Sequence, residues 1–180
     1  SIRKGLADQW GLQRVFNVQP GDAPVLPRNT EVVVVAVIDS GIDLQHPELL
    51  GRIWANPGEI PGNGPDDDGN GLIDDLNGWH YLAHNNDVRN TNGHGTLVAG
   101  LIAANTSNAL GIIGVNPRAR ILALKVTDFA GNGNSTDVAA AITYAANAGA
   151  RVINLSLGGS TFSKAERAAV EFAHEKGALV

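Results

Sequence analysis

The run Val-Val-Val-Val-Ala-Val-Ile at residues 32–38 constrains the fold of this chain more than any other stretch. Seven successive apolar residues, most of them β-branched, predict a strand buried on both faces, as in the centre of a parallel sheet. Further strands are predicted at 121–126, at 152–157 and from Ala178 onward. Helical patterns alternate with them, at 94–104, from Asn134 or Ser135 to just before Gly149, and from Ser163 to Gly177. This order predicts an α/β fold in three layers, with helices on both faces of a mostly parallel sheet.

The composition narrows the class of protein. With 43% hydrophobic and 17% charged residues over 180 positions, the chain is expected to be globular with a sizeable core. The net charge of −5, without any Lys/Arg run, argues against nucleic acid as a partner. The absence of cysteine excludes disulfides and thiol nucleophiles. We find neither an apolar run of membrane-spanning length nor a signal peptide, so no membrane contact is expected.

The sequence reads as one domain without an internal linker. Residues 1–31 are expected to form an irregular N-terminal arm. Residues 52–90 are rich in Gly, Pro, Asn and Asp, and a loop this long is usually functional or tied down by something. The chain stops three residues into the strand that begins at Ala178, which would leave an exposed apolar edge. We therefore expect further polypeptide, on this chain or on a second one, to complete the fold.

Two residues with catalytic potential follow from this layout. Asp39 stands at the carboxyl end of the first strand, and in open α/β sheets the working residues gather there. His94 opens a helix whose small residues Gly95, Ala99, Gly100 and Ala103 share one face, so that a neighbouring backbone can approach closely. An acid and a histidine at one sheet edge make two thirds of a nucleophile–base–acid set. The alternative is a turn aspartate and an incidental histidine.

Three motifs resemble those of the subtilisin-like serine proteases, the subtilases, of the calcium-binding bacterial type. They are Val37–Ile42 followed by His46–Leu49, Asn92–Gly100, and Val152–Gly159, in the family's order and spacing. The resemblance implies a subtilisin-like fold, incomplete at its C-terminus, and a serine endopeptidase in which Asp39 is the acid and His94 the base. One departure is Leu97, where the family more often has a second histidine.

The resemblance also implies a substrate cleft. Gly131, Asn132 and Gly133 would pair with an extended polypeptide substrate, and Ser156, Leu157 and Gly158 would form the other side. The family's Gly-Thr-Ser-x-Ala motif is missing, and so is its oxyanion-hole asparagine. Ser40 and Ser156 are poor candidates for the nucleophile. We therefore expect the serine and the asparagine to lie beyond residue 180, and this chain alone to be inactive.

A calcium site is predicted in the acidic stretch at 66–75. Asp66, Asp68, Asn70 and the Leu72 carbonyl follow the spacing of the first half of an EF-hand loop, and Asp75, with Asp74, would close the shell. Five acids within ten residues repel one another unless a hard cation is present. The alternative is a solvated acidic loop. A similar insertion is familiar in calcium-binding subtilases.

Other patterns are weaker. Positions that form a further Ca²⁺ site in some relatives correspond here to Glu48, Asn108 and the carbonyls of Asn105, Leu110 and Ile112, although an ordinary turn explains them equally well. His80 and His84 have the i, i+4 spacing of a zinc site but lack the H-E-x-x-H glutamate, so exposed histidines are the better interpretation.

Two other functions stay open at this point. The chain could be a catalytically inactive, calcium-dependent binding module or pseudo-protease. A nucleotide-binding domain is disfavoured, because the turn after the first strand lacks G-x-G-x-x-G and the phosphate-loop lysine. The family resemblance implies a secreted bacterial protein whose signal and pro-segment are absent from this chain.

Overall fold

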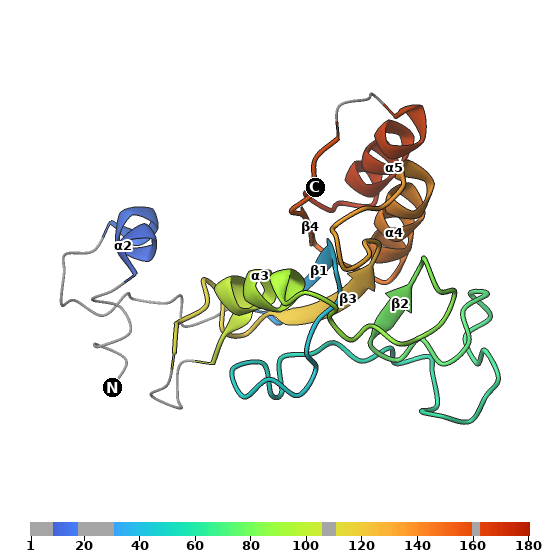
Figure 1. Ribbon diagram of the computed structural model, residues 1–180, viewed down its shortest axis with the longest axis horizontal. Coiled ribbons are helices and arrows are strands. Elements are labelled where there is room, and N and C mark those ends of the chain that lie inside the picture. The colour runs from blue at the N-terminus through green and yellow to red at the C-terminus, as the bar shows by residue number, and fades with distance from the viewer. Residues whose placement is uncertain (1–8, 18–30, 106–110, 160–162) are drawn as a thin grey trace.

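A computed structural model describes residues 9–17, 31–105, 111–159 and 163–180. Within these ranges four parallel strands form one sheet (Figure 1). Their spatial order is β2 (Gly78–His80), β3 (Arg120–Lys125), β1 (Val34–Asp39) and β4 (Val152–Leu155). The two central strands, β3 and β1, are the predicted apolar runs, and nearly all of their residues are buried.

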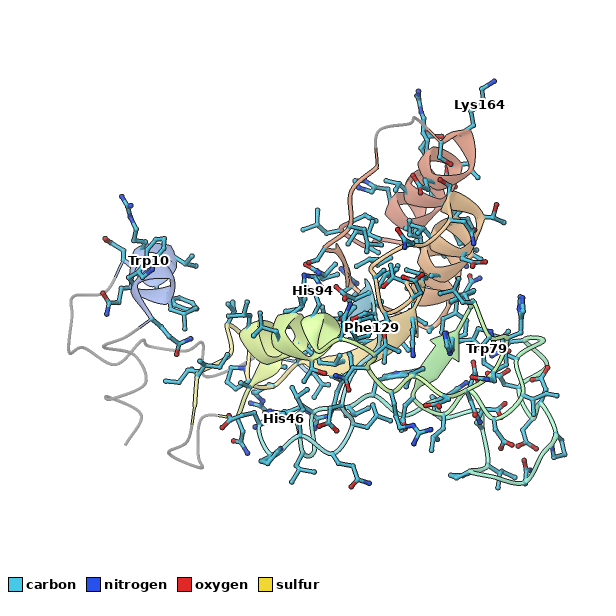
Figure 2. The ribbon with its side chains drawn as sticks, viewed as in Figure 1. Trp10, His46, Trp79, His94, Phe129 and Lys164 are labelled. Atoms are coloured by element: carbon cyan, nitrogen blue, oxygen red, sulfur yellow. The ribbon has the colours of Figure 1, made fainter. Side chains whose placement is uncertain are left out.

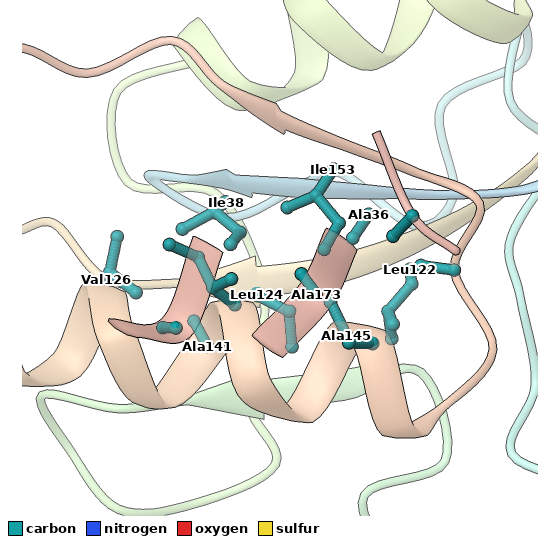
Figure 3. Close-up of a cluster of buried hydrophobic side chains, with 14 of the residues drawn as sticks. Ala36, Ile38, Leu122, Leu124, Val126, Ala141, Ala145, Ile153 and Ala173 are labelled. Atoms are coloured by element: carbon teal, nitrogen blue, oxygen red, sulfur yellow. The ribbon is translucent and has the colours of Figure 1, made fainter. Parts of the chain in front are cut away.

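Helices cover both faces of this sheet, as predicted. Helix α3 (His94–Ala103) packs on one face, over the alternate residues Val35, Val37, Ile121 and Ala123. Helices α4 (Ser135–Asn147) and α5 (Lys164–Glu175) lie together on the other face. Figure 3 shows this second core, in which Ala36, Ile38, Leu122 and Leu124 meet Ala141 and Ala145 of α4. Successive strand residues point to opposite faces, so both layers bury one half of each strand.

Side-chain caps fix where α4 and α5 begin. Asn134 Oδ1 accepts the backbone N–H of Asp137 at 2.8 Å. Ser163 Oγ accepts the N–H of Glu166 at 3.2 Å, which is one half of the predicted capping box. Each bond satisfies a donor that the first helical turn cannot pair internally.

Strand limits differ from the prediction by one or two residues. Asp39 is the last residue of β1 rather than the first residue after it, and β4 ends at Leu155, so Ser156 and Leu157 lie beyond the strand. Leu179 makes a parallel bridge with Val152, which agrees with a further strand beginning near Ala178.

Two elements were missed by the sequence analysis. Residues 1–31 were expected to be irregular, but Trp10–Phe16 form helix α2. None of its residues is buried, so no apolar periodicity marks it. Strand β2 lies inside the stretch 52–90, which was read as a loop. Three residues are too few for a strand pattern, and β2 forms because β3 offers an edge for pairing.

No helix within the described ranges has both the length and the apolar character that crossing a membrane requires.

Candidate active site and candidate metal centre

Asp39 and His94 meet at the carboxyl edge of the sheet. The Asp39 side chain is 2% exposed and ends β1. Its two oxygens lie 2.8 and 2.9 Å from His94 Nδ1, and Oδ1 also accepts the Ser40 N–H at 2.7 Å. Figure 2 shows His94 at the end of α3 that lies against β1. The pair expected from the sequence is therefore in direct contact.

The start of α3 is held close to β1 by small residues. Gly93 precedes the helix with a φ of 82°, a conformation that glycine adopts without strain. Gly95 sits so near the chain after β1 that a Cβ on it would lie 2.2 Å from the Gly41 carbonyl oxygen. The buried residues of α3 are the four small ones predicted, Gly95, Ala99, Gly100 and Ala103. This face lets the helix deliver His94 to a buried carboxylate.

The segment that leads into α3 is tied to both central strands. The Ile42 N–H donates to the Val88 carbonyl at 2.8 Å, and the Thr91 N–H donates to the Ser40 carbonyl at 3.2 Å. From β3, Lys125 Nζ donates to the Arg89 carbonyl at 2.8 Å. Burial lowers the pKa of this lysine. These bonds fix the approach of the segment to His94.

The contact determines which nitrogen of His94 is free. A carboxylate only accepts hydrogen bonds, so Nδ1 carries the proton and Nε2 is left with a lone pair. About half of the His94 side chain is exposed, with a relative accessibility of 52%. An imidazole oriented in this way takes a proton at Nε2, and the adjacent carboxylate stabilises the imidazolium that results.

Asp39 and His94 open onto a cleft of about 790 Å³. Among the residues expected to bind substrate, Gly131, Gly133 and the segment 156–158 line it. Asn132 does not line it, because its backbone N–H and carbonyl both bond to Asp128 and close a turn. Apolar side chains of α4 and α5 complete the wall, namely Val138, Ile142 and Val170.

The two serines considered at the sequence level have other partners. Ser40 is 1% exposed, and its Oγ accepts the Gly95 N–H at 3.2 Å. Ser156 Oγ accepts from Asn154 Nδ2 at 2.9 Å. Neither hydroxyl is hydrogen-bonded to His94 in the described part of the chain.

The acidic stretch at 66–75 folds differently from the expected ligand shell. Asp66 turns back on its own loop and accepts the N–H groups of Gly69, Asn70 and Gly71. These bonds lower the pKa of Asp66, the one from Gly71 most strongly. Asp74 has a φ of 53°, and its Oδ2 accepts the Gly64 N–H at 3.0 Å.

Three carboxylates converge instead. Ligand atoms of Glu59, Asp68 and Asp75 all lie within 4.8 Å of one another, and all three residues come from the insertion at 52–90. Glu59 and Asp75 are buried, with exposures of 7% and 0%. Asn56 Nδ2 donates to Asp68 Oδ2 and to Asp75 Oδ1, both at 2.9 Å. Asn70, another predicted ligand, donates to Asp68 and Asp75, while the Leu72 N–H bonds to Asn70 Oδ1.

Glu59 is the residue that the sequence analysis missed. It stands seven positions before Asp66, outside the EF-hand-like spacing, and the only available signal was a lone acid in a Gly/Pro-rich loop. Its Oε1 accepts the N–H groups of Asp67 and Asp68, whereas its buried Oε2 has no hydrogen-bond partner among the described residues. An oxygen-only donor set with an unsatisfied buried carboxylate oxygen suits Ca²⁺.

The further Ca²⁺ site suggested by the sequence lies partly outside the described residues. Asn108 and Leu110 lie outside the described residues. Glu48 and Asn105 are neighbours, because the Asn105 N–H donates to the Glu48 carbonyl at 2.9 Å. Ile112 is half-buried.

The two histidines at i, i+4 spacing have different surroundings. His80 ends β2, and burial lowers its pKa. His84 is exposed in a turn.

Comparisons with known proteins identify the family. Residues 30–180 match the model of the subtilase family. Thermitase of Thermoactinomyces vulgaris is 38% identical over 146 residues, covering 81% of this chain and 44% of thermitase. The thermophilic serine proteinase of Bacillus sp. (strain AK1) is 39% identical over 172 residues, covering 96% of this chain and 37% of that protein. The cell wall-associated protease of Bacillus subtilis (strain 168) is 34% identical over 141 residues, 78% of this chain and 14% of its own length.

Among solved structures, sphericase superposes with a TM-score of 0.67 at 30% identity, covering 94% of this chain and 50% of sphericase. The chain thus spans half or less of the length of these relatives. Because the family model covers most of the chain, and because Asp39 and His94 meet at the sheet edge from two of the family's motifs, this chain belongs to the subtilase family.

Proposed function

We propose that the protein containing this chain is a serine endopeptidase and that this chain supplies the acid and the base of its triad. The contact of His94 Nδ1 with both oxygens of Asp39 supports the proposal most directly, because it leaves Nε2 available for proton transfer beside a cleft. The nucleophilic serine and the oxyanion-hole asparagine come from sequence after residue 180.

In this mechanism the serine oxygen attacks the carbonyl carbon of a peptide bond while Nε2 of His94 removes the serine proton. Asp39 holds the ring in the required tautomer and compensates the positive charge that develops on it. Nε2 then returns the proton to the leaving amine, and water hydrolyses the acyl-enzyme with His94 again acting as base.

The substrate is an extended polypeptide. Gly131, Gly133 and the segment 156–158 line the cleft and offer backbone groups to a peptide that lies between them. Recognition through backbone hydrogen bonds tolerates many side chains. The relationship to a cell wall-associated protease supports an extracellular location for the protein.

The insertion at 52–90 holds a structural Ca²⁺ through Glu59, Asp68 and Asp75. At an effective dielectric of about 20, two like charges at this separation repel by roughly 3 kcal/mol. A divalent cation removes that repulsion and satisfies Glu59 Oε2. The bound ion supplies a fixed positive charge that stabilises the fold of the insertion.

The triad assignment is tested in the full-length protein. His94→Ala is expected to lower peptide hydrolysis by about 10³-fold and to reduce serine labelling by a fluorophosphonate probe, because the serine loses its base. His174→Ala, on the exposed far end of α5, is the control and leaves both unchanged. A full-length protein that is neither active nor labelled would identify a binding module instead. Hydrolysis by the pure 180-residue chain would contradict the division of the triad.

The metal assignment is tested by Glu59→Gln. Without calcium this variant should be at least as stable as the wild type, since it removes a buried charge that lacks a hydrogen-bond partner on one oxygen. With calcium it should be less stable, because a ligand is lost. Thermal unfolding in EDTA and in Ca²⁺ measures the change in stability under both conditions. Glu171→Gln, on the surface of α5, is the control. A Glu59→Gln protein with the wild-type calcium response would remove Glu59 from the site.

A further inference from the structure

The proposed metal centre is bonded to the helix that lines the cleft. The Tyr144 hydroxyl, from α4, donates to Asp75 Oδ2 at 2.5 Å across 69 positions of sequence. Asp75 also accepts from Asn56 on Oδ1 and from Asn70 on Oδ2. Of these donors in the described residues, Tyr144 alone lies outside the insertion at 52–90. The bond therefore joins the insertion to the body of the fold.

Helix α4 contains both Tyr144 and residues that line the cleft. Tyr144 and Ile142 lie two positions apart on the same helix, and Ile142 lines the cleft together with Val138 one turn earlier. Asn134, the N-cap of α4, lines it too. A helix is stiff along its axis because each turn is bonded to the next. Anchoring Tyr144 therefore restricts the wall that Val138 and Ile142 form.

We propose that Tyr144 is a positioning residue for the cation site, and that cation binding stabilises the α4 wall of the cleft through the Tyr144–Asp75 bond. The inference rests on the cation site described under Proposed function. Hydrogen bonds from outer groups orient ligating carboxylates, and losing such a partner typically lowers metal affinity by about 10- to 100-fold. Because the coupling is reciprocal, a cation that holds Asp75 also makes it harder for α4 to move away.

The alternative is that Tyr144 contributes only an aromatic ring to the core. Its ring does pack against the cluster shared by the sheet, α4 and α5. The chain offers a matched control in Tyr81, which is 7% exposed and belongs to the same cluster. Its hydroxyl is not among the donors to Asp75 in the described residues. Replacing either tyrosine by phenylalanine removes one hydroxyl and keeps the ring.

The experiment measures Ca²⁺ affinity by calorimetry on the full-length protein, with His94→Ala in every sample to prevent self-cleavage. Tyr144→Phe is expected to weaken Ca²⁺ binding by about tenfold, the loss typical of an outer-sphere partner. Tyr81→Phe is expected to leave the affinity within about twofold of its parent. Hydrogen exchange of the amides in residues 141–147, with and without Ca²⁺, is the second readout. Calcium should slow this exchange in the parent and in Tyr81→Phe but not in Tyr144→Phe.

The possible outcomes test the cation site and the role of Tyr144 separately. A parent protein that binds no Ca²⁺ contradicts the proposed cation site. A parent that binds Ca²⁺, with Tyr144→Phe behaving like Tyr81→Phe in both measurements, overturns the role of Tyr144 and leaves the site standing. If Tyr144→Phe does not fold, exchange in the parent alone decides, and unchanged α4 exchange on adding Ca²⁺ overturns the inference.

Discussion

At the residue scale, the site depends on one buried carboxylate and one half-exposed imidazole. Among the described residues, the Asp39 side chain has two donors, the Ser40 N–H and His94 Nδ1. Asp39 is 1% exposed, and the contact with His94 Nδ1 is direct. The chemistry of the site follows from this fixed orientation.

Asp39→Asn is expected to lower kcat of the full-length protein by about 10⁴-fold, because an amide beside Nδ1 favours the tautomer that protonates Nε2. The side chain keeps its shape, so the free energy of unfolding should change far less. The control is Asp43→Asn, whose activity should stay near that of the wild type. Within the described ranges the Asp43 side chain accepts only from the nearby Gln45 N–H. Steady-state kinetics on a peptide substrate measure the effect. An Asp39→Asn enzyme with wild-type kcat would contradict the assigned role.

The buried hydroxyl of Tyr81 should make the stability of the folded protein depend on pH in the alkaline range. Burial, with the nearby charges of Asp75 and Asp137, raises the pKa of Tyr81 above its ordinary value. The unfolded chain releases this proton above about pH 10 while the folded chain keeps it, so the stabilising contribution is complete below that pH and is lost as pH rises. Urea unfolding of the wild type should therefore show stability falling above about pH 10, and Tyr81→Phe should show a smaller fall. Parallel curves for the two proteins would contradict the effect.

At the element scale, the small residues of α3 allow the chain after β1 to pass close to the helix. Its inner face consists of glycine and alanine, and its first turn carries His94. Cβ atoms are absent where the chain after β1 passes, so the helix start can lie against the backbone that follows Asp39. Capped helices α4 and α5 cover the other face and form one wall of the cleft. The strands and helices thus bring two distant parts of the sequence to one edge.

Two glycines of α3 give opposite predictions for the same substitution. A Cβ at position 95 would lie 2.2 Å from the Gly41 carbonyl oxygen, so Gly95→Ala should destabilise the protein by about 3 kcal/mol and displace His94. At position 100 the nearest atom is Ile112 Cδ1 at 3.7 Å, an ordinary contact, so Gly100→Ala should be neutral or stabilise by up to about 1 kcal/mol. Chemical denaturation of both variants measures the difference. Equal effects at the two positions would contradict the close approach at Gly95.

At the scale of the whole molecule, the outer face of α3 is apolar as well. Leu97 and Leu101 lie one turn apart and are 65% and 49% exposed. The chain spans 44% of thermitase and 50% of sphericase, so a protein of their length has much more polypeptide to place. We propose that the rest of the domain covers this face.

Leu101→Lys tests this packing in two forms of the protein. In the 180-residue chain the position is exposed, and the free energy of unfolding should change by about 0.5 kcal/mol or less. In the full-length protein the same lysine would be buried without a partner and should destabilise by about 3 kcal/mol or more. Thermal or urea unfolding of both forms makes the comparison internally controlled. Similar changes in the two forms would place the rest of the domain elsewhere.

The sequence by itself predicted the class of fold and the pairing of Asp39 with His94. The apolar runs at 32–38 and 121–126 predicted central strands, because short continuous apolar runs bounded by turn signals are typical of strands buried on both faces. The motif around His94 predicted its place at the start of a helix with a small inner face, and the resemblance paired it with Asp39. These features depend on residues that are close together in the sequence, so they can be predicted from it.

Only the tertiary structure decided the rest. Strand β2 exists because β3 offers it an edge, and its three residues carry no pattern of their own. Glu59, Asp68 and Asp75 converge while Asp66 bonds within its own loop, because the path of the insertion, rather than spacing along the sequence, places the carboxylates. The Tyr144–Asp75 bond links residues 69 positions apart, and side-chain contacts of that range depend on how the layers pack.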